Sequence, residues 1–303
     1  MKNVKKFLCV TGSQQFADGM ELLFANIPEM QIDIICRHDS SWKRYIKRFF
    51  LLRNYDVLYL FWADFKIYRL LMYKLAGVKV INHFIGSDIL KIINSPFRPR
   101  LMPLVNSLSK IICVSPLLQQ ELKNLGVEAD LIPFTNLELK KREIDYPETR
   151  SAVIYIPNHN IEFYNFEMLM ELARRFPDVE FMIFPFDNSE IKLPDNVKSR
   201  ASIPRQQMFD FISKYRVFIR LPRHDGLPNT LLEALSIGRW CIWNFEFPHT
   251  FRVSDIDSLT EMFNLLINKK DPNYEAAEYV IDNFSHSHIS EIYKDFFSRY
   301  LLG

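Results

Sequence analysis

Two carboxylates, those of Asp225 and Glu233, are separated by seven residues in a stretch that predicts a strand, a loop and a helix. YRVFI (215–219) is a short apolar run typical of a buried strand, and RLPRHDG (220–226) is the polar loop after it. PNTLLEALSI (228–237) has the spacing of an amphipathic helix, with a proline near its start and a glycine where a helix stop is expected. Asp225 therefore precedes the helix, and Glu233 lies inside it.

The start of this helix, with a carboxylate on each side, favours a ligand that combines negative charge with hydroxyl groups. Free backbone N–H groups at a helix N-terminus attract phosphate, and carboxylates accept hydrogen bonds from sugar hydroxyls. At about 1.5 Å of rise per residue, the two carboxylates can flank a group roughly the size of a sugar. A nucleotide sugar meets both demands. A plainer interpretation stays open, since a Glu in a helix is usually solvated and an Asp before a Gly is usually a turn residue.

The same stretch resembles the signature of the retaining glycosyltransferases of family 4, in which an acidic residue, seven residues and a Glu are followed by Ala and a Gly-terminated helix. Here the pattern reads Asp225, GLPNTLL, Glu233-Ala234-Leu235 and Gly238. The loop Arg220–Gly226 is similar to that of a small branch with an Arg-Leu-Pro-x-His-Asp-Gly motif. The chain departs from the family at Asp225, where the usual residue is Glu.

The resemblance implies a GT-B fold, an α/β architecture of two Rossmann-like domains with parallel sheets facing a central cleft. It implies that Glu233 hydrogen-bonds the donor ribose, and that Asp225 and the backbone of residues 226–229 contact the transferred sugar and diphosphate. The catalytic candidates are Asp88, Asp225 and Glu233. The donor-binding candidates are Gly12, Arg220, Arg223, His224, Gly226, Leu227, Pro228, Asn229, Thr230 and Glu233.

Three sites depart from the family pattern. The stretch YIPNHNIEFYNFE (155–167) lacks the Arg and Lys that hold the donor diphosphate in many relatives, so Arg220 and Arg223 are the candidate substitutes. The loop after RWCIWNF has EFPHT in place of a Gly-Gly turn, and Ile85 takes the place of the acceptor-side His before Gly86.

Asp88 and His83 are the acceptor-side candidates. Asp88 follows a predicted strand and is placed to orient or deprotonate an acceptor hydroxyl, although it could equally cap the short helix DILKII. His83 ends an apolar strand, where a histidine is more often packed and hydrogen-bonded than reactive.

Strand and helix patterns alternate along the whole chain. The first half carries the strand-like runs KFLCV, QIDIIC, VLYLFW, KVINHF and KIICV, and the second carries SAVIYIP, VEFMIFP, VKSRASI, RVFIRLP and RWCIWNF. The polar stretch at 138–151 marks a domain boundary. We expect an acceptor-side domain over 1–145, a donor-binding domain over 146–285, and a final helix over 286–303 that packs back on the first domain.

Composition fits two domains of a protein from a reducing compartment. The chain has 303 residues, 48% of them hydrophobic, and a net charge of +2 that gives no reason to expect nucleic acid as a partner. Its four cysteines lie in apolar runs without CxxC spacing and predict buried thiols. No signal peptide or membrane span is expected, so the location predicted is cytoplasmic.

No metal and no cofactor beyond the nucleotide sugar is expected. Asp255-Ile256-Asp257 matches the DxD pattern that holds a divalent metal in another glycosyltransferase fold. It precedes the helical run SLTEMFNLLINK, however, and Asp is favoured as a helix cap. We therefore interpret Asp255 as a cap.

Residues Trp42–Arg53 combine a basic arc of Lys43, Arg44, Lys47 and Arg48 with an aromatic and apolar arc on a helical wheel. Such a helix could contact an anionic membrane peripherally, or it could be an ordinary helix of the domain.

The leading hypothesis is a metal-independent retaining glycosyltransferase that moves a sugar from a nucleotide sugar to a glycan or lipid-linked glycan, as in surface polysaccharide biosynthesis. The alternative is a non-catalytic GT-B protein that binds nucleotide or partners an active transferase.

Overall fold

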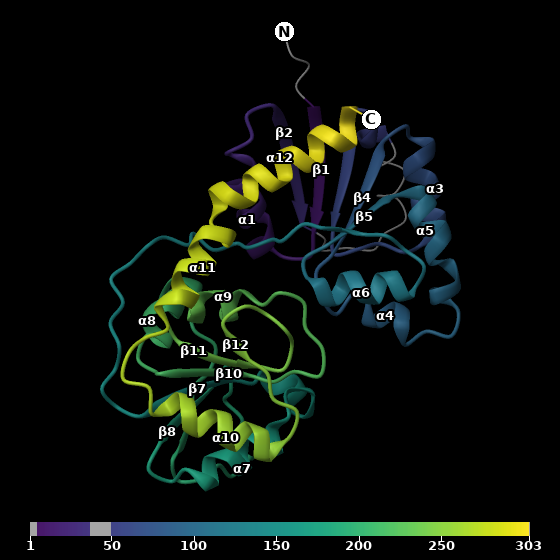
Figure 1. Cartoon of the computed structure of the whole chain (residues 1–303). Helices are drawn as coiled ribbons and strands as arrows, with labels where there is room; N and C mark the ends of the chain where they lie inside the picture. The colour runs from purple at the N-terminus through teal and green to yellow at the C-terminus, as the bar shows by residue number, and fades with distance from the viewer. Residues whose placement is uncertain (1–4, 37–49, 303) are drawn as a thin grey trace. The chain divides into compact units, whose positions relative to one another are not determined.

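The computed structural model describes residues 5–36 and 50–302 (Figure 1). The chain divides into two compact units, which are described separately. Unit 1 comprises Met1–Glu138 and His286–Gly303, and unit 2 comprises Leu139–Ser285. The division at Glu138 falls within the polar stretch that the sequence marks as a boundary.

Unit 1 contains a six-stranded parallel sheet in the order β2-β1-β3-β4-β5-β6. The strands are β1 (Lys5–Thr11), β2 (Met30–Cys36), β3 (Val57–Phe61), β4 (Lys79–Phe84), β5 (Lys110–Cys113) and β6 (Asp130–Leu131). Every residue of β3 is buried, as expected of an apolar strand covered on both faces. The helices are α1 (Gln14–Phe24), α3 (Ile67–Leu75), α4 (Leu90–Ile93), the 3-10 helix η1 (Arg98–Leu101), α5 (Met102–Leu108), α6 (Pro116–Asn124) and α12 (His286–Leu302).

The C-terminal helix α12 packs against the first helix and strand of unit 1, and is drawn in yellow in Figure 1. The ring centroids of Phe297 and Phe7 are 4.8 Å apart, and the Ser290 hydroxyl donates to the carbonyl oxygen of Leu23 at 3.1 Å. These contacts join the end of the chain to the core of unit 1.

Unit 2 repeats the arrangement with a parallel sheet in the order β12-β11-β10-β7-β8-β9. The strands are β7 (Ser151–Tyr155), β8 (Glu180–Phe184), β9 (Val197–Ser199), β10 (Val217–Arg220), β11 (Trp240–Trp243) and β12 (Thr250–Phe251). The helices are η2 (Asn158–Tyr164), α7 (Phe166–Arg175), η3 (Arg205–Gln207), α8 (Met208–Ile212), α9 (Asn229–Ser236), α10 (Ile256–Ile267) and α11 (Tyr274–Phe284).

The predicted α/β class with two parallel sheets is confirmed, and two details differ from expectation. The edge strands β6 and β12 have two residues each, too few to leave an alternating or apolar pattern in the sequence. Cys36 at the end of β2 is only half-buried, whereas Cys9, Cys113 and Cys241 are buried as expected. Within the described residues, no helix is long and apolar enough to cross a membrane.

Candidate functional site

The loop after β10 delivers its residues to the start of α9 as the sequence predicts. Pro228 is extended and occupies the N-cap position, so the helix begins at Asn229. It ends before Gly238, whose φ of +70° suits glycine, and a Cβ there would lie 2.9 Å from Cβ of Pro272. Residues 231–236 are all buried, which places the carboxylate of Glu233 inside the unit. The interpretation of Glu233 as a solvated surface residue is therefore wrong.

Glu233 pairs with Arg205, a residue that the sequence analysis did not single out. The Arg205 Nη1 atom donates to Glu233 Oε2 at 2.8 Å, and Glu233 is 0% exposed. Glu233 Oε1 and the nearby Thr230 Oγ1, one helical turn earlier, are buried without a hydrogen-bond partner among the described residues. One oxygen of the carboxylate is thus held by Arg205, while the other is buried without a partner among the described residues.

Burial sets the charge state of Glu233. Loss of solvent raises the pKa of its carboxyl group to about 7, and the opposing effects of Arg205 and Arg142 do not cancel that rise. The carboxylate therefore titrates near neutral pH.

Arg220 and Asp225, two of the candidate donor-site residues, are paired with each other. Arg220 Nε donates to Asp225 Oδ2 at 2.7 Å and Nη2 donates to Oδ1 at 3.3 Å, a two-point contact. The guanidinium lies 4.2 Å from the ring centroid of Tyr155 and 5.4 Å from that of Tyr164. Burial alone would lower the pKa of Arg220, but the Asp225 carboxylate outweighs it and raises the pKa further. Arg220 is thus a buried and neutralised cation of the loop.

The other residues of the loop and of the start of α9 differ in burial. The Arg223 side chain is exposed, while its backbone N–H donates to the carbonyl oxygen of Phe163 at 2.8 Å. Gly226 is buried, and its N–H donates to Asp225 Oδ1 at 3.1 Å. The remaining donor candidates of this unit are half-buried and lie in the loop or in the first turn of α9: His224, Leu227, Pro228, Asn229 and Thr230.

The other three candidates lie in unit 1. Gly12 is exposed between β1 and α1, and a Cβ there would lie 3.2 Å from Cε3 of Trp62. His83 is fully buried in β4. Asp88 is fully buried in the loop after that strand. The structure therefore places these three in unit 1, whereas the candidates of unit 2 are Arg220, Arg223, His224, Asp225, Gly226, Leu227, Pro228, Asn229, Thr230 and Glu233.

Asp88 organises the loop in which it lies. Its carboxylate accepts hydrogen bonds from the backbone N–H groups of Ala63, Ile85 and Gly86 at 3.0–3.3 Å. Burial raises the pKa of this carboxyl to about 6, against the lowering effect of those bonds. The helix after it, α4, has Ile89 at its N-cap, so the interpretation of Asp88 as the cap of that helix is wrong.

His83 is enclosed by hydrogen bonds of its own unit. Its Nδ1 atom lies 2.6 Å from the Tyr59 hydroxyl, and its Nε2 atom lies 3.1 Å from the carbonyl oxygen of Ile132. With Nε2 donating to that carbonyl, Nδ1 accepts from Tyr59. Burial lowers the pKa of His83 to about 3. Both ring nitrogens of His83 are thus engaged within unit 1, and its acceptor-side assignment stays a prediction.

This packing predicts acid sensitivity. An unfolded histidine gains its proton near pH 6.5, whereas folded His83 resists protonation until about pH 3. The stability that neutral His83 contributes is therefore complete above pH 6.5 and is lost as the pH falls toward 3. We expect the stability of β4, measured by amide hydrogen exchange, to fall by about 1.4 kcal/mol more per pH unit in the parent than in His83→Gln over that range. Equal pH slopes would contradict the buried neutral state.

Solved structures share this architecture over nearly the whole chain. Anabaena HepE in complex with UDP-glucose has a TM-score of 0.73 at 12% identity, covering 97% of this chain and 100% of HepE. The chain has the GT-B fold. The sucrose-phosphate synthase of Thermosynechococcus elongatus has a TM-score of 0.70 at 10% identity, covering 98% and 99% of the two chains. The lipopolysaccharide outer core galactosyltransferase WaaB has a TM-score of 0.69 at 13% identity, covering 97% and 99%. No family model and no curated protein matches the sequence.

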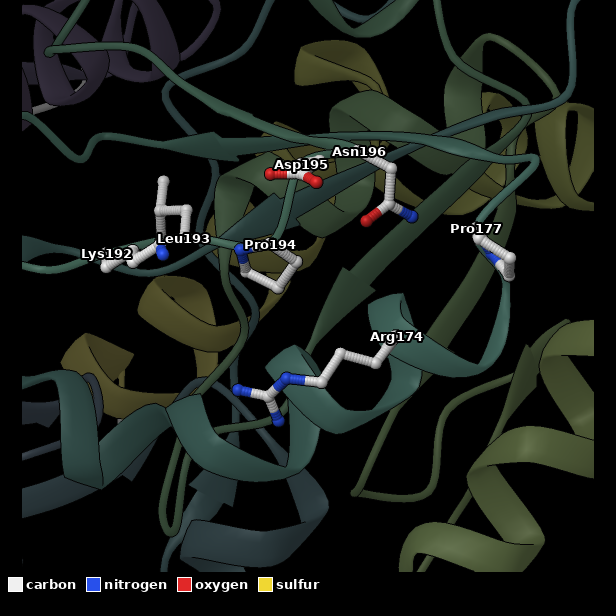
Figure 2. Close-up of a pocket in the computed structure, with 7 residues that line it drawn as sticks. All are labelled: Arg174, Pro177, Lys192, Leu193, Pro194, Asp195 and Asn196. Carbon is white, nitrogen blue, oxygen red and sulfur yellow. The ribbon is translucent and has the colours of Figure 1, made fainter.

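Two hollows of unit 2 in this GT-B chain lie away from the loop after β10. The larger, of about 680 Å³, lies at the end of α7 and before β8 and β9 (Figure 2). The strands β8, β9 and β10 are parallel. This hollow therefore lies at the amino-terminal ends of the strands, whereas Asp225 follows the carboxyl-terminal end of β10. The side-chain amide of Asn196 in this hollow donates hydrogen bonds to the carbonyl oxygens of Ala173, Phe176 and Val179. A smaller hollow of about 300 Å³ is lined by Arg142 and by Ser236 at the end of α9.

Asp255 is the N-cap of α10, as predicted for this GT-B chain. Its side chain accepts from the Ser258 N–H at 2.8 Å, and Ser258 completes a reciprocal capping box. Asp257 instead pairs with Arg175 at 3.1 Å. Across residues 5–36 and 50–302, no group of three or more His, Cys, Asp or Glu side chains has the geometry to hold a metal.

Removal of this cap has a small expected effect. Asp255→Ala should lower the urea midpoint of unit 2 and leave nucleotide binding unchanged, also in excess chelator. Asp257→Ala is the control, since Asp257 forms only an exposed ion pair with Arg175 and its loss should lower the midpoint less. Loss of nucleotide binding in either variant, or its recovery with manganese, would indicate a metal site at this position.

Of the predicted basic helix Trp42–Arg53, residues up to Phe49 lie outside the described part of the chain. Phe50 and Arg53 are exposed, and the Arg53 guanidinium lies 5.7 Å from the Phe50 ring centroid.

Proposed function

We propose that this GT-B chain is a retaining, metal-independent glycosyltransferase of the family 4 type, which transfers a sugar from a nucleotide sugar to a hydroxyl of a glycan or lipid-linked glycan. The observation that carries the proposal is the buried Glu233 carboxylate, with one oxygen fixed by Arg205 and the other unpaired. A buried, half-satisfied carboxylate is costly for the fold, and a vicinal diol such as ribose would satisfy it.

The diphosphate is assigned to the start of α9. Backbone N–H groups at this helix start and the exposed Arg223 are suited to the negative charge of the leaving group. Arg220 is not free for that role because it already binds Asp225. We assign Arg220 and Asp225 to holding the shape of the loop, so that Gly226 and its successors face the donor.

Unit 1 is assigned to the acceptor. Asp88 acts there through the loop that it holds, since its carboxylate is committed to three backbone N–H groups. The complexes of HepE with UDP-glucose and the galactosyltransferase activity in the name of WaaB support a nucleotide sugar as donor and a glycan as acceptor. Surface polysaccharide or glycoconjugate synthesis is the setting that fits, with no further cofactor.

A non-catalytic GT-B protein is the second candidate. It is favoured by the neutralised Arg220 and by the absence of Lys and Arg in residues 155–167. Release of nucleoside diphosphate from a panel of nucleotide sugars, with and without glycan acceptors, separates the two. Acceptor-dependent release from one donor supports the transferase. A rise in melting temperature with nucleoside diphosphate but no release from any donor supports the second candidate, and no nucleotide binding at all would contradict the transferase.

A further inference from the structure

Unit 1 exposes large apolar side chains on a layer of helices in which α5 contacts both α3 and η1. The helices α3 and α5 lie on one side of the sheet (Figure 1). Tyr68, Leu75 and Phe97 are 64%, 79% and 71% exposed. Six exposed side chains form the apolar part of this face: Tyr68, Leu71, Leu75, Phe97, Leu101 and Leu104.

The helix α3 shows why these side chains are unusual. It already buries Leu70 and Tyr73 against the unit, which is the apolar side that a domain helix needs. Tyr68, Leu71 and Leu75 follow a spacing of three and four residues and form a second apolar stripe that faces solvent. Exposed apolar side chains that gather on one layer of helices in this way indicate a binding surface.

The charges of the same layer all have one sign. The exposed ionisable side chains of this layer and of α4, which contacts η1, are Lys66, Lys74, Lys91, Arg98 and Arg100. Between residues 65 and 109 the only acidic residue is Asp88, which is 0% exposed. None of the five cations forms an ion pair with an acidic residue in the described parts of the chain. We call the six apolar side chains and these five cations the basic apolar face.

We propose that the basic apolar face docks the protein reversibly on an anionic lipid surface. Leucine side chains enter the boundary between headgroups and acyl chains, Tyr68 and Phe97 suit the interface, and the flexible Lys and Arg side chains reach the phosphates. Charge excludes a second copy as the occupant, because two such faces would bring like charges together. The proposal goes beyond glycosyl transfer and does not require nucleotide binding.

The test is sedimentation of the full chain with vesicles of phosphatidylcholine alone or of equal parts phosphatidylcholine and phosphatidylglycerol. We expect binding to the anionic vesicles only, weakened by salt. Replacement of Lys66, Lys74 and Arg100 with Gln should weaken binding roughly 100-fold. Leu71→Ser with Leu75→Ser should also reduce it more than about tenfold, since the apolar contact is lost.

Matched controls lie in unit 2. The exposed Leu265 replaced with Ser, and the exposed Lys192, Lys214 and Lys270 replaced with Gln, should leave vesicle binding unchanged. Because every substituted side chain is exposed, circular dichroism should show all variants folded. The proposal is overturned if the parent ignores anionic vesicles at low salt, if the face variants bind like the parent, or if the parent is a dimer that the Leu variants dissociate.

Discussion

Asp225→Asn is expected to destabilise unit 2 by about 3–5 kcal/mol, the cost of leaving a buried cation without its partner. The Arg220 and Asp225 side chains are 9% and 14% exposed, so water cannot replace the lost carboxylate. The remaining contacts of the guanidinium, with Tyr155 and Tyr164, do not supply a charge. The loss of stability is measured by urea denaturation that is monitored through hydrogen exchange of the β10 amides.

Two controls separate this effect from a general loss of charge. Glu180→Gln breaks the exposed pair of Glu180 with Lys198 in the same unit, and should cost less than about 1 kcal/mol. Arg220→Met combined with Asp225→Asn should recover part of the stability, because no unpaired buried cation remains. A cost for Asp225→Asn no larger than that for Glu180→Gln would contradict the buried pair.

Glu233→Gln is expected to weaken nucleotide-sugar binding by about 1.5–3 kcal/mol, roughly 10- to 150-fold, the value of a hydrogen bond to a charged group. The proposed ribose contact uses the unpaired Oε1 atom, and an amide at this position accepts more weakly than a carboxylate. Calorimetric titration with the nucleotide sugar measures the change. Glu261→Gln, on the exposed side of α10, is the matched control and should bind as the parent does.

The pKa of Glu233 near 7 gives this prediction a pH dependence. As the pH rises from about 6 to 8, Glu233 loses its proton, and the carboxylate is a stronger hydrogen-bond acceptor than the protonated acid. The affinity for the nucleotide sugar should therefore increase. A nucleotide sugar is the suitable probe because its diphosphate is a diester without a proton to lose in this range. The increase in affinity should be absent in Glu233→Gln. Equal pH profiles for parent and variant would contradict the proposed contact between Glu233 and the nucleotide sugar.

The sequence predicts the central parallel strands of both units well because β3, β7 and β10 are short apolar runs buried along nearly their whole length. The outer strands β2 and β9 are less buried. The same reasoning places the signature loop before α9, with a glycine to end the helix. Two-residue edge strands such as β6 and β12 carry too little pattern to be found this way.

Pairing between distant residues is the part of the site that the sequence does not reveal. Arg205 lies 28 residues from Glu233, in a segment without a motif, and only the packing of η3 near α9 brings the two together. Arg220 and Asp225 were both recognised as candidates, but their spacing of five residues in a loop does not predict that they neutralise each other. Asp88 and His83 likewise have suitable residue types, yet their hydrogen bonds depend on loops and strands far away in the chain.

The most direct test of the proposed site is a crystal structure of the protein soaked with a nucleoside diphosphate such as UDP. The account predicts ribose hydroxyls within hydrogen-bond distance of Glu233 Oε1 and the diphosphate at the first N–H groups of α9. Nucleotide bound elsewhere, or no nucleotide at a saturating concentration, would contradict the account.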